Sequence, residues 1–141
     1  MSKTCYSVLI ERSAKYARSQ DRKLRIYFEG AGPAEDGDII SYAKALKKDG
    51  MPFDQNNSAS YGALTAEEFR DIVRGDPRRK TKATPMMQVA DLVLYPMAKG
   101  GYDPTYRPYK KLMEHGKLID AVLKPEDRSS QGIKYSCFPM V

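Results

Sequence analysis

Apolar residues near the start of the chain recur every three or four positions, a spacing that predicts an amphipathic helix over residues 4–19. Its apolar face is formed by Tyr6, Leu9, Ile10, Ser13, Ala14 and Ala17. The next apolar run, Leu24–Phe28, is rich in β-branched and aromatic residues and predicts a short buried strand. Glu29 and a glycine-rich turn follow directly. The pattern therefore delivers a carboxylate at the carboxyl end of a strand, where open α/β sheets bind their ligands.

Helical spacing returns after this turn. The apolar positions are Ile39, Tyr42, Ala43 and Leu46. They predict a helix that starts at Asp36 or Gly37, where negative charge favours a helix N-terminus, and that ends at Gly50. Residues 51–62 are polar and predict a loop. Thr65 and Glu68 then have the spacing of a capping box, which predicts another short helix.

The most apolar segment, Met86–Tyr95, carries one carboxylate, Asp91, in its middle. Thr84 and Pro85 precede it as an N-cap and a first-turn proline, so we expect a helix. An acid within so apolar a helix is expected to be buried, which is costly unless a cation or a hydrogen-bond donor meets it. Two interpretations stay open: Asp91 is a functional ligand, or it caps a loop or pairs with one of the many Lys and Arg side chains.

The remaining chain predicts further helices. Pro96 and the Gly100-Gly101 pair indicate a break, and Tyr106–His115 and residues 117–123 have helical patterns. The tail Ile133–Phe138 alternates like a strand.

Composition is that of a single soluble globular domain spanning residues 1–141, with 41% hydrophobic and 30% charged residues. The sequence shows no apolar stretch of membrane-spanning length and no signal-peptide core, so we expect a cytoplasmic protein without a membrane partner. Two isolated cysteines and a single histidine, His115, argue against zinc sites and histidine-dependent triads.

The net charge of +6 favours polyanionic partners, and the cations are clustered. The segment before the Asp91 helix contains the candidate nucleic-acid contacts Arg78, Arg79, Lys80 and Lys82. Basic residues there can hold a phosphate backbone. The alternative is an ordinary solvated basic loop.

Several of these segments together resemble a known family. They are the strand ending in Glu29-Gly30, Asp36 seven positions further on, the run Met87–Pro96 and the closing Gly132–Phe138. The family is the bacterial and phage domain of unknown function 3800, which is placed with the ribonuclease H-like nucleases. The resemblance implies a partial ribonuclease H-like α/β fold, with few strands and several helices packed on them, that corresponds to the C-terminal two-thirds of such a domain.

The same resemblance implies a carboxylate site for Mg²⁺ or Mn²⁺. Glu29 and Asp91 match two of the family's catalytic acids, and Asp36 is a candidate third metal ligand. Family members also open with an Asp-Glu-Ser strand that this sequence lacks, so the implied site is incomplete. Two-metal phosphodiester hydrolysis needs carboxylates around both ions.

The sequence is compatible with three functions. The chain is a metal-dependent phosphodiesterase or nuclease, or an inactive form of one; it is a non-catalytic nucleic-acid-binding module; or it is a protein-interaction subunit. For the third, the resemblance leaves one edge of Leu24–Phe28 without a neighbouring strand. We expect a second copy of the chain, a separate polypeptide or the tail Ile133–Phe138 to bind at that edge.

Overall fold

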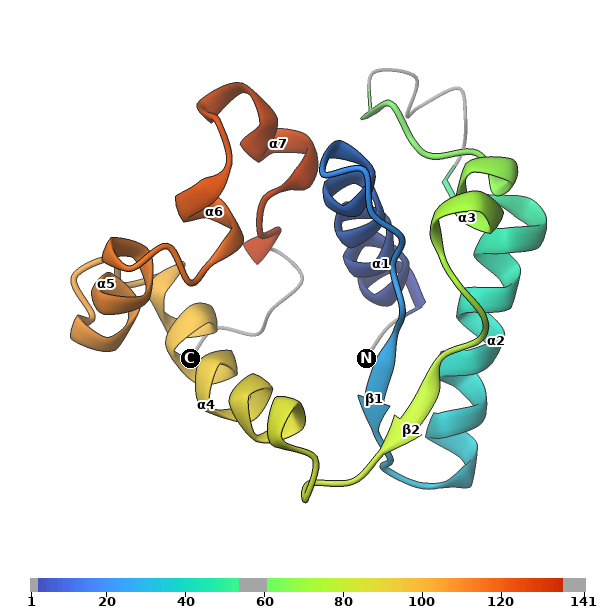
Figure 1. Cartoon of the computed structure of the whole chain (residues 1–141), viewed down its shortest axis with the longest axis horizontal. Helices are drawn as coiled ribbons and strands as arrows, with labels where there is room; N and C mark the ends of the chain where they lie inside the picture. The colour runs from blue at the N-terminus through green and yellow to red at the C-terminus, as the bar shows by residue number, and fades with distance from the viewer. Residues whose placement is uncertain (1–2, 54–60, 136–141) are drawn as a thin grey trace. The chain divides into compact units, whose positions relative to one another are not determined.

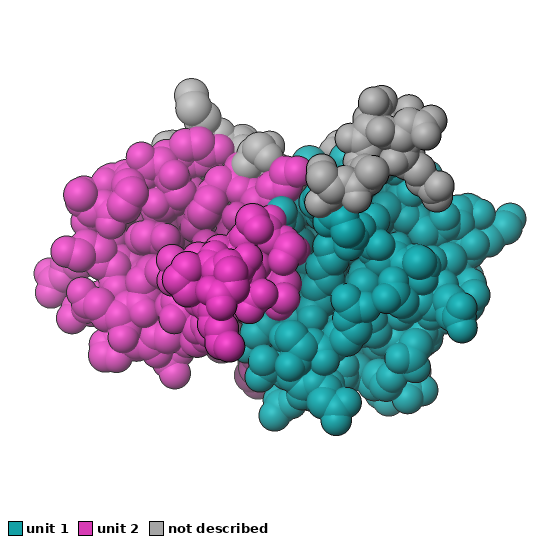
Figure 2. Space-filling view, turned by 90° about the horizontal axis from the view of Figure 1, so that it is seen from above, with its two compact units in different colours: residues 1–81 teal, residues 82–141 magenta. Residues whose placement is uncertain are grey.

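The computed structural model describes residues 3–53 and 61–135. The protein is mostly helical with one two-stranded parallel sheet, which confirms the expected α/β class. The chain divides into two compact units, residues 1–81 and residues 82–141, which Figure 2 shows in different colours. The elements of unit 1 are α1 (Lys3–Ser19), β1 (Tyr27–Glu29), α2 (Pro33–Asp49), α3 (Ala66–Ile72) and β2 (Arg78–Lys80). Those of unit 2 are α4 (Pro85–Gly100), α5 (Arg107–Glu114), α6 (Ile119–Val122), the 3₁₀ turn η2 (Pro125–Asp127) and α7 (Arg128–Gln131).

The core of unit 1 lies where α1, α2 and α3 pack together (Figure 1). Its buried members are Tyr6, Ile10, Ala14, Ala17, Ala43, Leu46, Leu64, Phe69, Ile72 and Val73. Of the apolar positions predicted on the first helix, Leu9 is an exception, because 53% of it is exposed. The helix itself is confirmed, one residue longer at its start than predicted.

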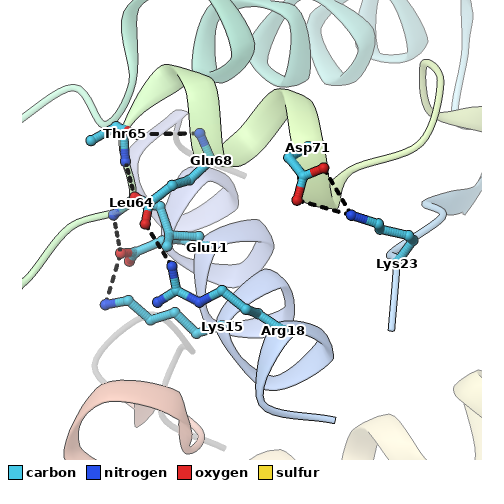
Figure 3. Close-up of polar contacts among 8 residues, drawn as sticks. All are labelled: Glu11, Lys15, Arg18, Lys23, Leu64, Thr65, Glu68 and Asp71. Atoms are coloured by element: carbon cyan, nitrogen blue, oxygen red, sulfur yellow. Dashed lines mark hydrogen bonds and ion pairs between the residues drawn. The ribbon is translucent and has the colours of Figure 1, made fainter. Parts of the chain in front are cut away.

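The predicted capping box at the start of α3 is confirmed (Figure 3). The Glu68 N–H donates to Thr65 Oγ1 at 3.2 Å, and the Thr65 N–H donates to Glu68 Oε2 at 2.8 Å. Leu64 before the box and Phe69 after it are both buried in the core. This local pattern fixes where α3 begins.

Strands β1 and β2 run parallel and side by side, with Tyr27 opposite Arg78 and Glu29 opposite Lys80 (Figure 1). The basic segment, for which an ordinary solvated loop was one of the two interpretations, is thus partly a strand. Before β1, the Leu24 N–H donates to the Ile72 carbonyl, and the Ile26 carbonyl accepts from the N–H of Arg78 at the start of β2. Because backbone groups alternate in direction along a strand, those of Arg25 and Tyr27 face the opposite edge. Within the described residues the sheet has no third strand at that edge.

Two helix boundaries differ from the predictions. Helix α2 begins at Pro33 rather than at Asp36 or Gly37, because a proline suits the first helical turn, where its missing N–H costs nothing. Helix α4 continues through Pro96 to Gly100. Pro96 leaves the Leu92 carbonyl without its helical donor, and Leu92 is 76% exposed, so water can solvate that carbonyl.

The predicted helices after the Asp91 segment are confirmed as α5 and α6. In unit 2 the Tyr109 ring of α5 packs directly on Gly100, where a Cβ would overlap it. The rings of Tyr95 and Tyr106 meet edge to face, with 6.2 Å between centroids. Residues 133–135 form no strand, so the strand predicted for Ile133–Phe138 is wrong there, and residues 136–138 lie outside the described ranges, as do 54–60 of the predicted loop.

No helix in the described ranges has the length and apolar character needed to cross a membrane.

Candidate functional site

Glu29 lies at the carboxyl end of β1, opposite Lys80 of β2 in the parallel register. Glu29 is partly buried, whereas in the predicted strand Leu24–Phe28 only Phe28 is fully buried. Parallel pairing places side chains of opposite residues on one face of the sheet, so Tyr27, Glu29, Arg78 and Lys80 share a face. On this face Lys80 Nζ lies 5.1 Å from the centre of the Tyr27 ring, a cation–π contact.

Asp36 closes the turn between β1 and α2. Its Oδ1 accepts a hydrogen bond from the Ala31 N–H at 3.0 Å, and its Oδ2 lies 3.6 Å from Arg79 Nε. The Asp36 side chain is only 14% exposed. Arg79 crosses over Gly30 to reach it, and a Cβ at Gly30 would overlap the Arg79 side chain. The contacts among Gly30, Asp36 and Arg79 therefore stabilise the turn after Glu29.

The expectation that Asp91 is buried is wrong. Asp91 and Gln88, three residues apart on α4, are both exposed. The apolar positions around them are exposed too, including Met86 at 71% and Leu92 at 76%. The physical reason lies in unit 2, where α5 packs against the C-terminal end of α4 and leaves its N-terminal turns uncovered. Burial therefore supplies no reason for an acid at this position.

The three candidate metal ligands do not form a single cluster within one unit. Glu29 and Asp36 belong to unit 1, and Asp91 belongs to unit 2. Across the described residues there is no group of three or more His, Cys, Asp or Glu side chains arranged to hold a metal ion.

The candidate nucleic-acid contacts Arg78, Arg79 and Lys80 make up the whole of β2, and all three are exposed. They do not point the same way: Arg78 and Lys80 share the face with Tyr27, whereas Arg79 projects from the other face toward Asp36. Lys82, also exposed, is the first residue of unit 2. Arg78 and Lys80 are therefore the two contacts best placed to bind a ligand together.

An arginine pocket that the sequence did not predict adjoins β2. Leu24 pairs with Val73 and Tyr27 pairs with Arg78. Two residues, 25–26, separate the first partners, whereas four residues, 74–77, separate the second, so residues 74–77 loop outward. Gly75, with φ of 66°, makes the bend. The loop opens a pocket of about 200 Å³ lined by Arg25, Ile26, Tyr27, Arg74, Gly75, Asp76 and Arg78.

Two acids near this pocket form ion pairs with lysines. Asp76 Oδ2 lies 3.6 Å from Lys44 Nζ, and both oxygens of Asp71 lie 2.9 Å from Lys23 Nζ (Figure 3). The Lys23 hydrogen bond lowers the pKa of Asp71. Over the described parts of the chain, none of the three pocket arginines forms an ion pair with a carboxylate. The positive charge of the pocket is therefore available to a ligand.

A second feature missed by the sequence analysis is the buried Glu11 of α1, which is 0% exposed. Its Oε1 lies 2.9 Å from Lys15 Nζ and accepts the Leu64 N–H at 3.2 Å (Figure 3). Tyr61 lies beside the pair, and burial, reinforced by Glu11, raises its pKa to about 12. Glu11 and Lys15 are four residues apart on one helix, and this spacing was the available signal. The pair ties α1 to the segment that starts α3.

Comparison with known proteins gives one informative similarity. No family model matches the chain, and no solved structure matches it. Among curated proteins, the chain is similar to the "Uncharacterized protein y4pM" of Sinorhizobium fredii (strain NBRC 101917 / NGR234), at 36% identity over 141 residues. The similarity covers 98% of this chain but 49% of the relative, so the chain spans about half the length of the curated relative. The name of that relative states no activity.

Proposed function

We propose that this protein binds nucleic acid through the basic face of unit 1, as part of a ribonuclease H-like protein of the domain of unknown function 3800 family. The observation that carries the binding proposal is β2 itself, a strand made wholly of exposed cations. Arg78 and Lys80 are two residues apart on one face, about 6.6 Å along an extended strand. Cations spaced along an edge suit the regular charges of a phosphate backbone.

The neighbouring aromatic side chain adds to this proposal. Tyr27 is 45% exposed and lies on the same face as Arg78 and Lys80. A nucleic-acid base can stack on such a ring while the cations hold the phosphates. Since this arrangement reads charge and base planes and no base edges, we expect binding with little sequence preference.

The test is the salt dependence of oligonucleotide binding. Fluorescence anisotropy measures the affinity for labelled single-stranded DNA, single-stranded RNA and duplex DNA at several salt concentrations. Each lysine that contacts a phosphate contributes about 0.7 to the slope of log affinity against log salt for single strands and about 0.9 for a duplex. Lys80→Gln should reduce the slope by that amount. Lys48→Gln removes the same charge from an exposed position on α2 and should leave the slope unchanged. Equal effects of both variants would mean that only net charge matters and would reject β2 as the contact surface.

Metal-dependent cleavage is the second candidate function, and the position of Glu29 favours it. Glu29 ends a strand in a parallel pair, and Asp36 is held in the turn that follows. Carboxylate oxygens suit Mg²⁺ and Mn²⁺. Arg79 already pairs with Asp36, however, so an ion would have to compete with that cation. Asp91, the other candidate ligand, belongs to unit 2 and is tested separately.

Calorimetric titration with Mn²⁺ tests this second function. Wild type is compared with Glu29→Gln and with Asp91→Asn, and the same samples are assayed for nuclease activity. A variant that loses binding identifies its own acid as a metal ligand. If wild type and both variants give the same heats, the carboxylates hold no ion and cleavage by this chain is rejected.

A further inference from the structure

We infer that the pocket lined by Arg25, Arg74 and Arg78 is a binding site for a phosphate monoester, and specifically for the terminal phosphate of a nucleic-acid strand. The choice of a nucleic acid as the source of that phosphate rests on the proposed function above. The site itself rests on separate observations: the cavity, its charge and an unused backbone donor.

The charge of the pocket matches a dianion better than a single negative charge. Its seven lining residues include three arginines and one acid, Asp76, which pairs with Lys44. A phosphodiester within a strand carries one negative charge, whereas a terminal phosphate carries close to two at neutral pH. Guanidinium groups bind phosphate oxygens in pairs of parallel hydrogen bonds, which accounts for arginines rather than lysines at such a site.

A backbone donor also faces the segment that opens the pocket. The Leu24 N–H bonds to the Ile72 carbonyl, and the next amide facing the same way is that of Ile26. Because residues 74–77 loop outward, the Ile26 N–H has no acceptor among the described residues, although the Ile26 carbonyl accepts from Arg78. A phosphate oxygen in the pocket would satisfy this donor.

The size and surroundings of the pocket fit the end of a strand. Its volume of about 200 Å³ accommodates a phosphate and part of its sugar but not a longer segment of chain. Tyr27 lines the pocket and also lies on the face with Lys80, so the last nucleotide can place its phosphate among the arginines and its base toward the ring. The rest of the strand would then follow β2.

The experiment compares three oligonucleotides of one sequence, bearing a 5′-phosphate, a 3′-phosphate or hydroxyls at both ends, each labelled internally. Charge-assisted hydrogen bonds to an added dianion predict about tenfold tighter binding of one phosphorylated form. Arg74→Gln should reduce that ratio toward one. Arg22→Gln removes the same charge from an exposed arginine that does not line the pocket, and it should keep the ratio. Inorganic phosphate at millimolar concentration should compete with the phosphorylated form more than with the hydroxyl form.

The outcomes separate this inference from the proposed function. If all three oligonucleotides bind with equal affinity, the terminal-phosphate site is rejected while nucleic-acid binding stands. If Arg74→Gln and Arg22→Gln reduce the ratio equally, the preference comes from net charge and the pocket is rejected. If no oligonucleotide binds, both the inference and the proposed function fail. Circular dichroism of each variant shows whether it remains folded.

Discussion

The buried Glu11–Lys15 pair offers the sharpest test of how unit 1 is held together. Glu11→Gln keeps the length of the side chain and an oxygen for the Leu64 N–H, but it removes the negative charge next to Lys15 Nζ at 2.9 Å. Lys15 is 7% exposed and would be left as a buried cation without its carboxylate. Removing one partner of a buried ion pair costs about 3–5 kcal/mol.

Two retained contacts place the expected cost at the lower end of that range. Lys15 Nζ lies 4.6 Å from the centre of the Tyr61 ring, and this cation–π contact survives the substitution. The hydrogen bond from Leu64 also survives, so no backbone donor is orphaned. We therefore expect Glu11→Gln to lower the free energy of unfolding by about 3 kcal/mol. At an m-value of roughly 1.5 kcal/mol/M, the urea midpoint would fall by about 2 M.

The assay is urea unfolding followed by circular dichroism and by the NMR signals of α1. Lys15→Met alone should also destabilise, because it leaves the carboxylate buried without its cation. The double variant Glu11→Gln with Lys15→Met removes both charges and should recover most of the loss. Lys23→Gln, which breaks an exposed pair with Asp71, serves as the control and should barely move the midpoint. A midpoint shift below about 0.5 M for Glu11→Gln, or a double variant as unstable as the sum of the singles, would refute a buried ion pair here.

Three further predictions follow from particular contacts. The hydrogen bond from the Thr65 N–H and, after it, the pair with Arg18 lower the pKa of Glu68 below its ordinary 4.5. The ionised Glu68 therefore stabilises the fold fully above pH 4.5, and this stabilisation is lost as the pH falls through the lowered pKa. Glu68→Gln should lower the free energy of unfolding at pH 7 by about 1 kcal/mol and should flatten the acid side of a curve of stability against pH. Gly37→Ala in α2, with no atom within 4 Å of the new Cβ, should stabilise by about 0.4–1 kcal/mol, whereas Gly100→Ala, which meets the Tyr109 ring, should destabilise by about 1–3 kcal/mol in thermal unfolding. If no strand covers the outer edge of β1, NMR hydrogen exchange should find the amides of Arg25 and Tyr27 unprotected while that of Phe28 is protected; slow exchange at all three would show that another chain or segment pairs there.

The sequence predicted the parts of the fold that local chemistry determines. The capping box of Thr65 and Glu68 was confirmed because both partners lie within one helical turn. The apolar stripe of α1 and the glycine that follows α2 were likewise visible in short windows, and Gly50 has the expected positive φ of 79°. Each of these features requires no knowledge of what lies across the core.

Features that depend on pairing between distant segments were missed. An Arg-Arg-Lys run has no apolar alternation, so β2 is a strand only because β1 supplies its partner. The arginine pocket exists because residues 25–26 lie opposite the longer segment 74–77, between the paired residues Leu24↔Val73 and Tyr27↔Arg78. Neither segment alone shows this difference in length. Arg25 and Arg74 are 49 positions apart, and only the sheet brings them to one pocket.

The wrong prediction that Asp91 is buried has a related physical cause. A helix that is almost wholly apolar is expected to be buried, and in the α4 segment Met86–Tyr95 only Gln88 and Asp91 interrupt the apolar sequence. Its exposed residues, Met86, Val89, Leu92, Leu94 and Tyr95, show that unit 2 does not supply the cover. In unit 1 the outer edge of β1 likewise has no neighbouring strand within the described residues, although parallel strands are ordinarily flanked by others. A partner of α4 would bind through apolar side chains, whereas a partner of the β1 edge would bind through backbone hydrogen bonds. Leu92→Asn therefore tests the first surface, and amide exchange at Tyr27 tests the second. If Leu92→Asn changes the state of association while Tyr27 exchanges freely, α4 is the binding surface; if Tyr27 is protected and Leu92→Asn has no effect, the β1 edge is.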